Sequence, residues 1–302
     1  MSFQITTAFV EQYSANVEHL AQQMESRFAG KVREESQQGK SKAFEQLGAT
    51  QAVKRTSRHA DTPRVDSNHQ RRWAYLSDYD WSDLVDSLDD LKMLIDPKSS
   101  YAQSAAMAMN RAMDEEVIAA ATGTAYADTG GGNGAGSPVV LPSTQKIAVN
   151  YVASGSPANS GLTLAKLIKA KSILGKAEFP AGSQTYFAYT QQQLDDLLLN
   201  VAQVSNADYA AVKALVDGEV SYFMGFNFIK TELLAHNVST DVRTCFAYVK
   251  VALLRNIGKA PSGSVDKRPD KNNAWQVYSN MSVGAARMQE KGVVEVLCDE
   301  SP

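Results

Sequence analysis

The segment from Pro97 to Thr122 most constrains the fold, because its sequence predicts one long, uninterrupted helix. Pro97 suits a first helical turn, where its fixed φ and missing N–H cost nothing. The interior is rich in Ala, Met, Glu, Gln and Arg, and Gly123 follows its end. At about 1.5 Å per residue, such a helix would be nearly 40 Å long. Small and apolar side chains at three- and four-residue spacing predict one packed stripe: Tyr101, Ala105, Ala108, Met109, Ala112, Met113 and Val117.

The composition indicates a globular protein with room for two domains. The 302 residues are 44% hydrophobic, and the longest wholly apolar runs are far shorter than the ~20 residues needed to cross a bilayer. The N-terminus lacks a basic region followed by an apolar core, so no secretory signal is predicted. Two cysteines 53 residues apart suggest reduced thiols rather than a disulfide framework.

Charge is more informative locally than in total. The net charge of −3 gives no general attraction for nucleic acid. Residues 54–72, however, carry a net charge of +4, and residues 78–90 hold six aspartates and no base. These two blocks are either solvated faces or contacts between subunits. The candidate contact residues are Lys54, Arg55, Arg58, Arg64, Arg71, Arg72, Asp78, Asp80, Asp83 and Asp86.

The first 96 residues predict two helices separated by a polar arm. Residues 7–28 have apolar side chains at helical spacing and predict a first helix, with a cap at Thr6 or Thr7. Residues 30–80 are polar, with few aliphatic side chains, and predict an extended arm whose partners come from elsewhere. Strand pieces are expected at 40–44, 50–56 and 71–76. A short helix is expected from Asp80 or Ser82 to Ile95.

The glycine-rich stretch at 128–138 raises the question of a phosphate-binding loop. A Walker A loop needs a Lys and a Ser or Thr after its last glycine, and a dinucleotide loop needs a preceding strand and a following helix. In this chain a helix precedes the stretch, and Ser-Pro with a β-like segment follows it. The stretch therefore predicts a flexible connector.

The rest of the chain alternates helices and strands, and predicts a mixed α+β domain. Thr163 and Thr190 are expected to cap two helices, the first with an apolar face of Leu164, Leu167, Ile168 and Ile173. A further helix is predicted at 207–216 and a polar loop at 262–273. Strands are predicted at 185–189, 219–230, 245–254, 274–283 and 292–297.

The residues predict no catalytic or metal site. The four histidines are scattered without metal-ligand spacing, and the aspartates of 78–90 lack the glycine and terminal Glu of a calcium loop. No Gly-x-Ser-x-Gly nucleophile motif occurs. We therefore expect neither an enzyme nor a cofactor.

The order of these parts resembles the major capsid protein of tailed bacteriophages, the HK97-fold family. The most similar stretches are 164–198, 206–234 and 265–300, where Gly284-Ala-Ala-Arg287 precedes a final hydrophobic strand. The resemblance covers essentially the whole chain. It implies an N-terminal arm at 1–29, an extended loop (the E-loop) at 30–80, a peripheral domain at 81–145 and 286–302 with the spine helix 97–122, and an axial domain at 146–285.

The resemblance also implies partners and a location. The chain would self-assemble as hexamers and pentamers into the icosahedral shell of a virion, enclosing double-stranded DNA without sequence specificity. Scaffolding and portal proteins, and possibly a decoration protein, would be further partners, with no membrane. Synthesis would take place in the host cytoplasm. Two alternatives stay open: an encapsulin-like cargo shell, and a soluble enzyme that uses the Gly130–Gly136 loop.

Overall fold

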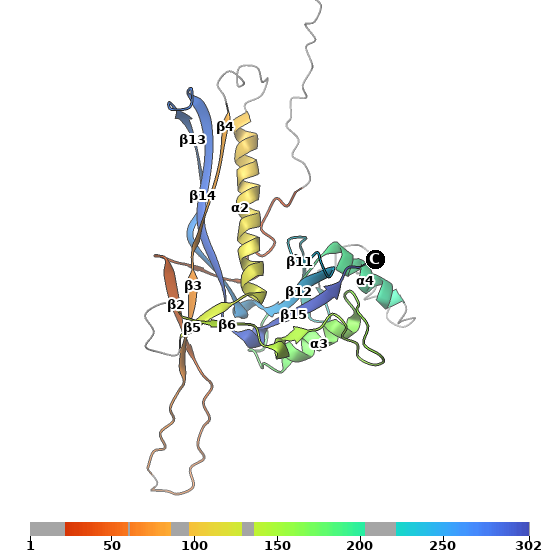
Figure 1. Cartoon of the computed structure of the whole chain (residues 1–302). Helices are drawn as coiled ribbons and strands as arrows, with labels where there is room; N and C mark the ends of the chain where they lie inside the picture. The colour runs from red at the N-terminus through yellow and green to blue at the C-terminus, as the bar shows by residue number, and fades with distance from the viewer. Residues whose placement is uncertain (1–21, 60, 86–96, 129–135, 203–221, 302) are drawn as a thin grey trace, which may run out of the picture. The chain divides into compact units, whose positions relative to one another are not determined.

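The computed structural model describes residues 22–59, 61–85, 97–128, 136–202 and 222–301 (Figure 1). The chain divides into two compact units. The first unit comes from the segments Met1–Glu25, Asp78–Arg111 and Lys259–Met281, and the second comes from Ser26–Ser77, Ala112–Gly258 and Ser282–Pro302. The predicted α+β fold class is confirmed, since helices and three β-sheets occur together.

The predicted long helix is confirmed with its predicted bounds. Helix α2 spans Pro97–Thr122, 26 residues without a break, and is the yellow helix of Figure 1. Gly123 closes it by donating its N–H to the carbonyl of Ala119 at 2.9 Å. The favourable helix propensity of its residues thus agrees with the observed structure.

The first sheet corrects the predicted helix that was to begin at Asp80 or Ser82. Residues Ser77–Val85 form strand β4, at the end of a sheet with the order β1-β13-β14-β4. Tyr79 and Trp81 are half-buried while Asp78 and Asp80 are exposed, which is the two-residue period of a strand. Residues 86–95 of the predicted helix lie outside the described residues. The other strands of this sheet are β1 (Arg33–Ser36), β13 (Leu253–Arg268) and β14 (Ala274–Arg287).

The predicted polar loop at 262–273 is mostly strand. Strand β13 continues through Arg268, and the turn to β14 includes Asn272 and Asn273 with φ of 49° and 57°. Asparagine tolerates this left-handed backbone better than most residues. The polar residues of β13 follow from exposure, because almost every residue from 258 to 268 is exposed.

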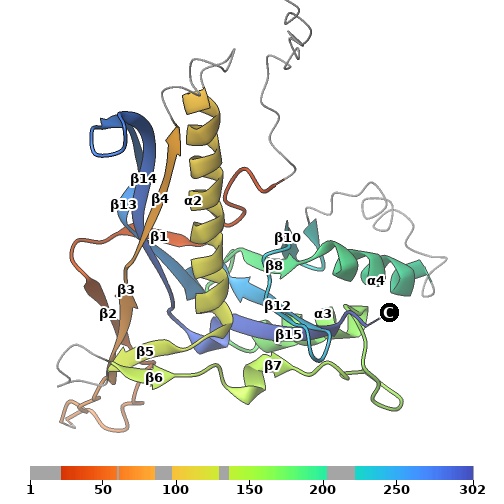
Figure 2. The same ribbon diagram turned by 45° about the horizontal axis from the view of Figure 1, so that its top comes forward.

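A seven-stranded sheet forms the centre of the second unit, with the order β7-β15-β12-β8-β10-β9 and β11 paired to β12. Helix α3 packs on this sheet, where it contacts β15 and β12, and helix α4 packs against α3 (Figure 2). The elements are β7 (Lys146–Ile147), β8 (Thr185–Tyr189), β9 (Tyr222–Phe223), β10 (Phe226–Lys230), β11 (His236–Asn237), β12 (Val242–Val249), β15 (Val293–Asp299), α3 (Leu164–Gly175) and α4 (Gln191–Ala202). Short 3-10 turns occur at Ser143–Gln145, Lys250–Ala252 and Glu290–Gly292.

The helix caps of this unit were predicted with mixed success. Thr163 caps α3, accepting the N–H of Lys166 at 3.4 Å. The predicted apolar face of α3 is partly wrong, because Ile168 is exposed and Lys166 is buried in its place. Thr190 precedes α4, but its hydroxyl donates to Glu300, and Glu232 accepts the N–H of Gln191 instead.

A hairpin replaces the single strand predicted at 219–230. Strands β9 and β10 pair antiparallel, with Phe223 opposite Phe226. Met224 and Gly225 form the turn with φ of 49° and 83°, as in the two-residue turns of β-hairpins. The predicted helix at 207–216 lies outside the described residues.

A third, four-stranded sheet carries the predicted arm. Its order is β2-β3-β5-β6, and all three pairs are antiparallel. The strand pieces predicted at 40–44 and 71–76 are confirmed, but residues 50–56 form no strand. The strands are β2 (Ser41–Leu47), β3 (His69–Tyr75), β5 (Ala125–Asp128) and β6 (Ser137–Val139).

The N-terminal helix predicted at 7–28 is not present where it can be checked. Residues 22–28 form bends and turns, and residues 7–21 lie outside the described part. Phe28 instead inserts into the core, where its ring stacks on Phe246 with centroids 6.0 Å apart. Tertiary packing therefore overrides the helical spacing at this end of the segment.

The C-terminal strand belongs to the seven-stranded sheet. Strand β15, which the resemblance assigns to a peripheral domain with the spine helix, pairs with β12 and β7. Both cysteines lie in this sheet as free, buried thiols. The division into axial and peripheral domains remains a prediction.

Candidate subunit-contact surface

The arm that links β2 to β3 is exposed throughout its described length. All described residues from 47 to 69 are exposed, and none from 48 to 68 belongs to a helix or strand (Figure 1). A loop of this length without a core is uncommon inside a compact domain. Three aliphatic side chains on it are also exposed: Leu47, Val53 and Val65.

Four of the six predicted basic contact residues lie on this arm. Arg55 donates to the carbonyl of Ser57 at 2.8 Å, and Arg64 lies 3.5 Å from Asp66. Lys54 and Arg58 have no ion pair with any described residue. The charges of the arm therefore have only local partners or none in this part of the chain.

The other two predicted basic residues, Arg71 and Arg72, point elsewhere. Arg71 pairs with Glu45 on the neighbouring strand at 3.0 Å. Arg72 is buried and binds Glu290 at 2.6 Å, so it is not a free surface charge and its prediction as a contact residue needs correction. Because residues 72 and 74 face the same side of β3, Arg72 lies beside the small core of Phe44, Ala74, Leu254, Ala286 and Met288.

The aspartate block of the first unit is mostly exposed. Asp78 and Asp83 are exposed, and Asp80 accepts a hydrogen bond from the Tyr278 hydroxyl at 2.6 Å. This bond raises the pKa of Tyr278, because the phenol donates to a carboxylate. Asp86 lies outside the described residues.

Cations and one aromatic ring fix the base of the arm. The ammonium of Lys42 lies 4.8 Å from the Phe44 ring centroid and 2.9 Å from Glu35. The bond to Lys42 lowers the pKa of Glu35. Gln46 donates to the carbonyl of Met288 at 2.7 Å. The arm therefore starts from a fixed base although its outer part has no such support.

The predicted packing stripe of α2 is buried in part. Ala105, Met109, Met113 and Val117 are buried, whereas Tyr101, Ala108 and Ala112 are half-buried. Met107 and Asp114 are also buried, and neither was predicted.

Asp114 anchors the chain where it enters the second unit. Its carboxylate accepts hydrogen bonds from the Ser26 hydroxyl at 2.6 Å and from the N–H of Arg27 at 2.7 Å. Arg255 donates to the same hydroxyl at 3.1 Å and pairs with Glu34 at 2.6 Å. Asp114 is the first of three consecutive acids in the sequence, so no sequence signal singles it out as the buried anchor.

Arg287 fixes the C-terminal end of α2 by donating hydrogen bonds to backbone carbonyls. It is fully buried and donates to the carbonyls of Ala121 at 3.0 Å, Gly123 at 2.6 Å and Val139 at 2.9 Å. Cations at a helix C-terminus are favourable because the last carbonyls lack partners within the helix. Burial lowers the pKa of Arg287.

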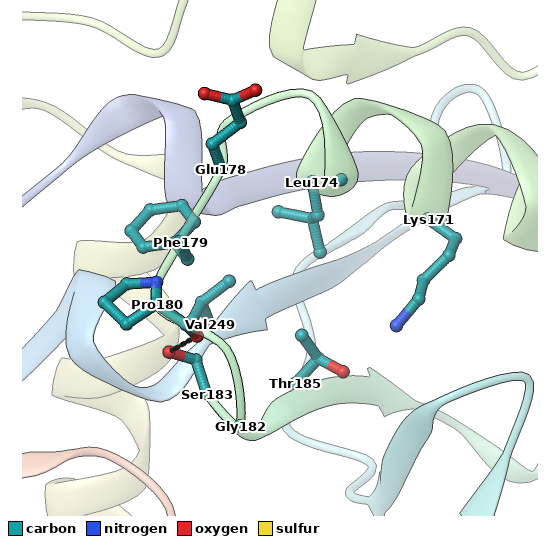
Figure 3. A pocket seen from close by; sticks show the side chains of 10 residues that line it. Lys171, Leu174, Glu178, Phe179, Pro180, Gly182, Ser183, Thr185 and Val249 are labelled. Atoms are coloured by element: carbon teal, nitrogen blue, oxygen red, sulfur yellow. Dashed lines mark hydrogen bonds between the residues drawn. The ribbon is translucent and has the colours of Figure 1, made fainter.

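One small pocket lies at the end of α3, with a volume of about 160 Å³ (Figure 3). Lys171, Glu178, Ser183 and Thr185 are among its lining residues. Ser183 donates to the carbonyl of Pro180 at 2.7 Å, and Thr185 donates to Gly225. Both hydroxyls are thus used by the backbone, and no base accepts a hydrogen bond from either one.

The glycine-rich stretch joins two antiparallel strands. It connects β5 to β6, and Gly136 packs closely on Trp73, since a Cβ on it would lie 2.9 Å from that ring. A phosphate-binding loop would lead into a helix, and a strand follows here. Residues 129–135 lie outside the described residues. Among the described residues, no group of three potential metal ligands occurs.

Comparison with known proteins identifies the family. The model of the phage capsid protein family matches residues 5–300. Comparison with curated proteins gave no match. The capsid of cyanophage P-SCSP1u is 16% identical, with a TM-score of 0.74 over 97% of this chain and 94% of that one.

Two further capsids show the same fold at low identity. The capsid of Ralstonia phage GP4 is 9% identical, with a TM-score of 0.72 over 100% of this chain and 99% of that one. The capsid of a native GTA particle is 14% identical, with a TM-score of 0.65 over 95% and 94% of the two chains. These likenesses support the HK97-like fold, and the family match over nearly the whole length shows that this chain belongs to the phage capsid protein family.

Proposed function

We propose that copies of this chain assemble as hexamers and pentamers into an icosahedral shell that encloses double-stranded DNA. The observation that carries the proposal is the arm at 48–68, whose described residues are all exposed and have their hydrogen bonds and ion pairs only within the arm itself. A protein that works as a monomer gains nothing from such a segment, because ordering it costs conformational entropy. An arm laid over a neighbouring subunit recovers that cost.

Opposite charges supply one contact of the arm. Lys54, Arg55, Arg58 and Arg64 are exposed on it, and Asp78 and Asp83 are exposed on strand β4. Arg72 is left out of this pairing because it is buried against Glu290, and Asp80 because it accepts the Tyr278 hydroxyl, whereas the only described partner of Arg64 is the exposed Asp66 on the arm itself. The pairing proposed here joins the arm of one copy to β4 of the next.

The remaining partners follow from the shell. Scaffolding and portal proteins would guide assembly, and a decoration protein could bind outside. With a net charge of −3, the shell would hold DNA by confinement and scattered contacts, without sequence readout. No helix in the described residues is both long and apolar enough to span a membrane. Synthesis in the host cytoplasm before incorporation into the virion completes the proposal.

Imaging and size measurement test the proposal. Expressed alone or with its scaffold, the chain should elute in the void volume of a sizing column and show round shells by negative-stain microscopy. Shells filled with an enzyme cargo would support an encapsulin-like role instead. A small oligomer under every condition would contradict the proposal and reopen an enzymatic reading of the Gly130–Gly136 loop.

A further inference from the structure

Strand β2 has an unpaired edge. It is the end strand of its sheet, and the backbone groups of Gly48 and Lys40 bond to the β3 side at 2.8 and 3.2 Å. Since bonding alternates along an antiparallel strand, the even-numbered residues of β2 face β3. The N–H and C=O groups of the odd-numbered residues therefore point to the open edge: Ser41, Ala43, Glu45 and Leu47. All four side chains are exposed.

This edge lacks most of the usual protection. Natural edge strands are shortened, bulged, covered, charged or interrupted by proline, because an open edge pairs with any free strand. Among the outward-pointing residues of β2 only Glu45 is charged. Strand β2 has seven residues without proline or glycine, and no other described strand covers its outer side. The edge is therefore suited to accept one more strand.

The same chain offers a segment with strand sequence and no partner. Residues 50–56 read TQAVKRT, and no backbone hydrogen bond joins any of residues 49–59 to another described residue. None of these residues has a positive φ, so their backbone is compatible with a strand. Figure 1 shows the arm continuing away from the end of β2, which keeps the segment from folding back onto the edge of its own chain.

We propose that residues 50–57 of a second copy add to β2 as an antiparallel strand. This deepens the proposed shell function, on which it rests. One register places Val53 opposite Leu47, which brings together two aliphatic side chains that are 58% and 64% exposed in the single chain. The same register places Arg55 opposite Glu45.

That register extends a contact already present. Glu45 pairs with Arg71 across β2 and β3 at 3.0 Å, so Arg55 of the second copy would add a second cation on the other side. Opposite charges that face each other across strands stabilise pairing. Arg58, one residue beyond the added strand, would fall opposite Lys42, which is neutralised by Glu35 at 2.9 Å.

Proline substitution tests the backbone pairing. In this register the N–H of Val53 points to β2 of the other copy and the N–H of Ala52 points away. Val53→Pro should raise the protein concentration needed for assembly by about tenfold, because each contact loses a donor. Ala52→Pro, the matched control in the same exposed segment, should assemble within about twofold of the unmodified chain. Equal behaviour of the two variants would overturn the proposal.

Cysteine pairing between copies tests the register directly. Copies with Leu47→Cys are assembled with separate copies carrying Val53→Cys, so any disulfide must join two chains. Oxidation should give a dimer-sized band on a non-reducing gel, and pairing Leu47→Cys with Ala52→Cys should give much less. Shells that form normally without this band would overturn strand addition alone, whereas absence of shells from the unmodified chain would overturn the proposed function.

Discussion

The outer arm and the seven-stranded sheet belong to the same unit but differ in what satisfies their backbone. In β8, β12 and β15 each strand has partners on both sides, and residues 245–249 are at most 2% exposed. In the arm every described residue from 47 to 69 is exposed, and no backbone–backbone hydrogen bond joins residues 49–59 to another described residue. Buried backbone N–H and C=O groups must be hydrogen-bonded within the subunit. Exposed ones can bond to water until a neighbouring subunit binds.

This difference separates folding from assembly. Substitutions in the sheet should lower the free energy of unfolding of a single subunit. Substitutions in the outer arm should leave that quantity unchanged and affect only the association of subunits.

The largest effect is expected from Phe28→Ala. Phe28 is fully buried, stacks on Phe246 and lies 6.4 Å from the Tyr248 ring. Truncation leaves a cavity under the sheet and should cost about 3–5 kcal/mol of the free energy of unfolding. Urea unfolding of unassembled subunits measures this cost. Ile168→Ala, at an exposed apolar position, is the control and should cost less than about 0.5 kcal/mol.

Arg287→Met is expected to have the next largest effect. The substitution keeps much of the volume but removes the donors for the carbonyls of Ala121, Gly123 and Val139. We expect a loss of about 3 kcal/mol, since buried acceptors are left unpaired. Hydrogen exchange should speed up at the last turn of α2 before other parts of that helix. Uniform exchange along the whole helix would show that Arg287 does not hold its end.

The sequence predicted the elements whose periodicity is satisfied inside one chain. Helix α2 and strand β8 appeared with their predicted bounds, because apolar spacing and propensity agree there. The polar strand β13 was missed because polarity was taken as a loop signal, although an exposed strand needs no apolar face. Strand β4 was missed because tertiary pairing overrode a short helical pattern.

The exposed charges of the candidate contact surface were predictable only as a class. A block of bases and a block of aspartates are visible in the sequence, and four of the bases do lie exposed on the arm. Arg72 looks the same as Arg71 in sequence, yet one is buried against Glu290 and the other is exposed beside Glu45. Adjacent residues of a strand point to opposite faces of the sheet. Which of the two bases is buried therefore depends on which face the other elements cover.

A pH effect is expected from Lys166. Its ammonium is buried and donates to the carbonyls of Ser160, Gly161 and Leu297, at 2.6, 2.9 and 2.9 Å. Burial lowers the pKa of Lys166 below its ordinary value of 10.5. The folded state therefore releases its proton at a lower pH than the unfolded state. Its contribution to the free energy of unfolding should then rise with pH between the lowered pKa and 10.5.

Comparison with Lys166→Met isolates this effect. The difference between the unfolding free energies of the native chain and the variant should grow with pH in that window, by at most about 1.4 kcal/mol per pH unit. Urea titrations at several alkaline pH values measure the slope. A flat difference would mean that Lys166 keeps its proton in both states throughout the window.

The smallest effect on the subunit, and the clearest separation of folding from assembly, is expected from reversing Arg55, Arg58 and Arg64 to Glu. These side chains are exposed and outside the core, so the urea midpoint of the unassembled subunit should not change. Each exposed pair with a neighbour contributes only about 0–1 kcal/mol, but a closed shell repeats every pair in each subunit. Shell yield at low salt should therefore fall. The deficit should shrink as salt rises, because the screening length shortens.

Replacing Arg268 and Lys271, two bases of the other exposed hairpin, by Glu gives a control of matched sign, since neither is part of the proposed pairing. Normal shells from the arm variant at low salt would reject the charge pairing with β4, and would also count against the strand register that places Arg55 opposite Glu45.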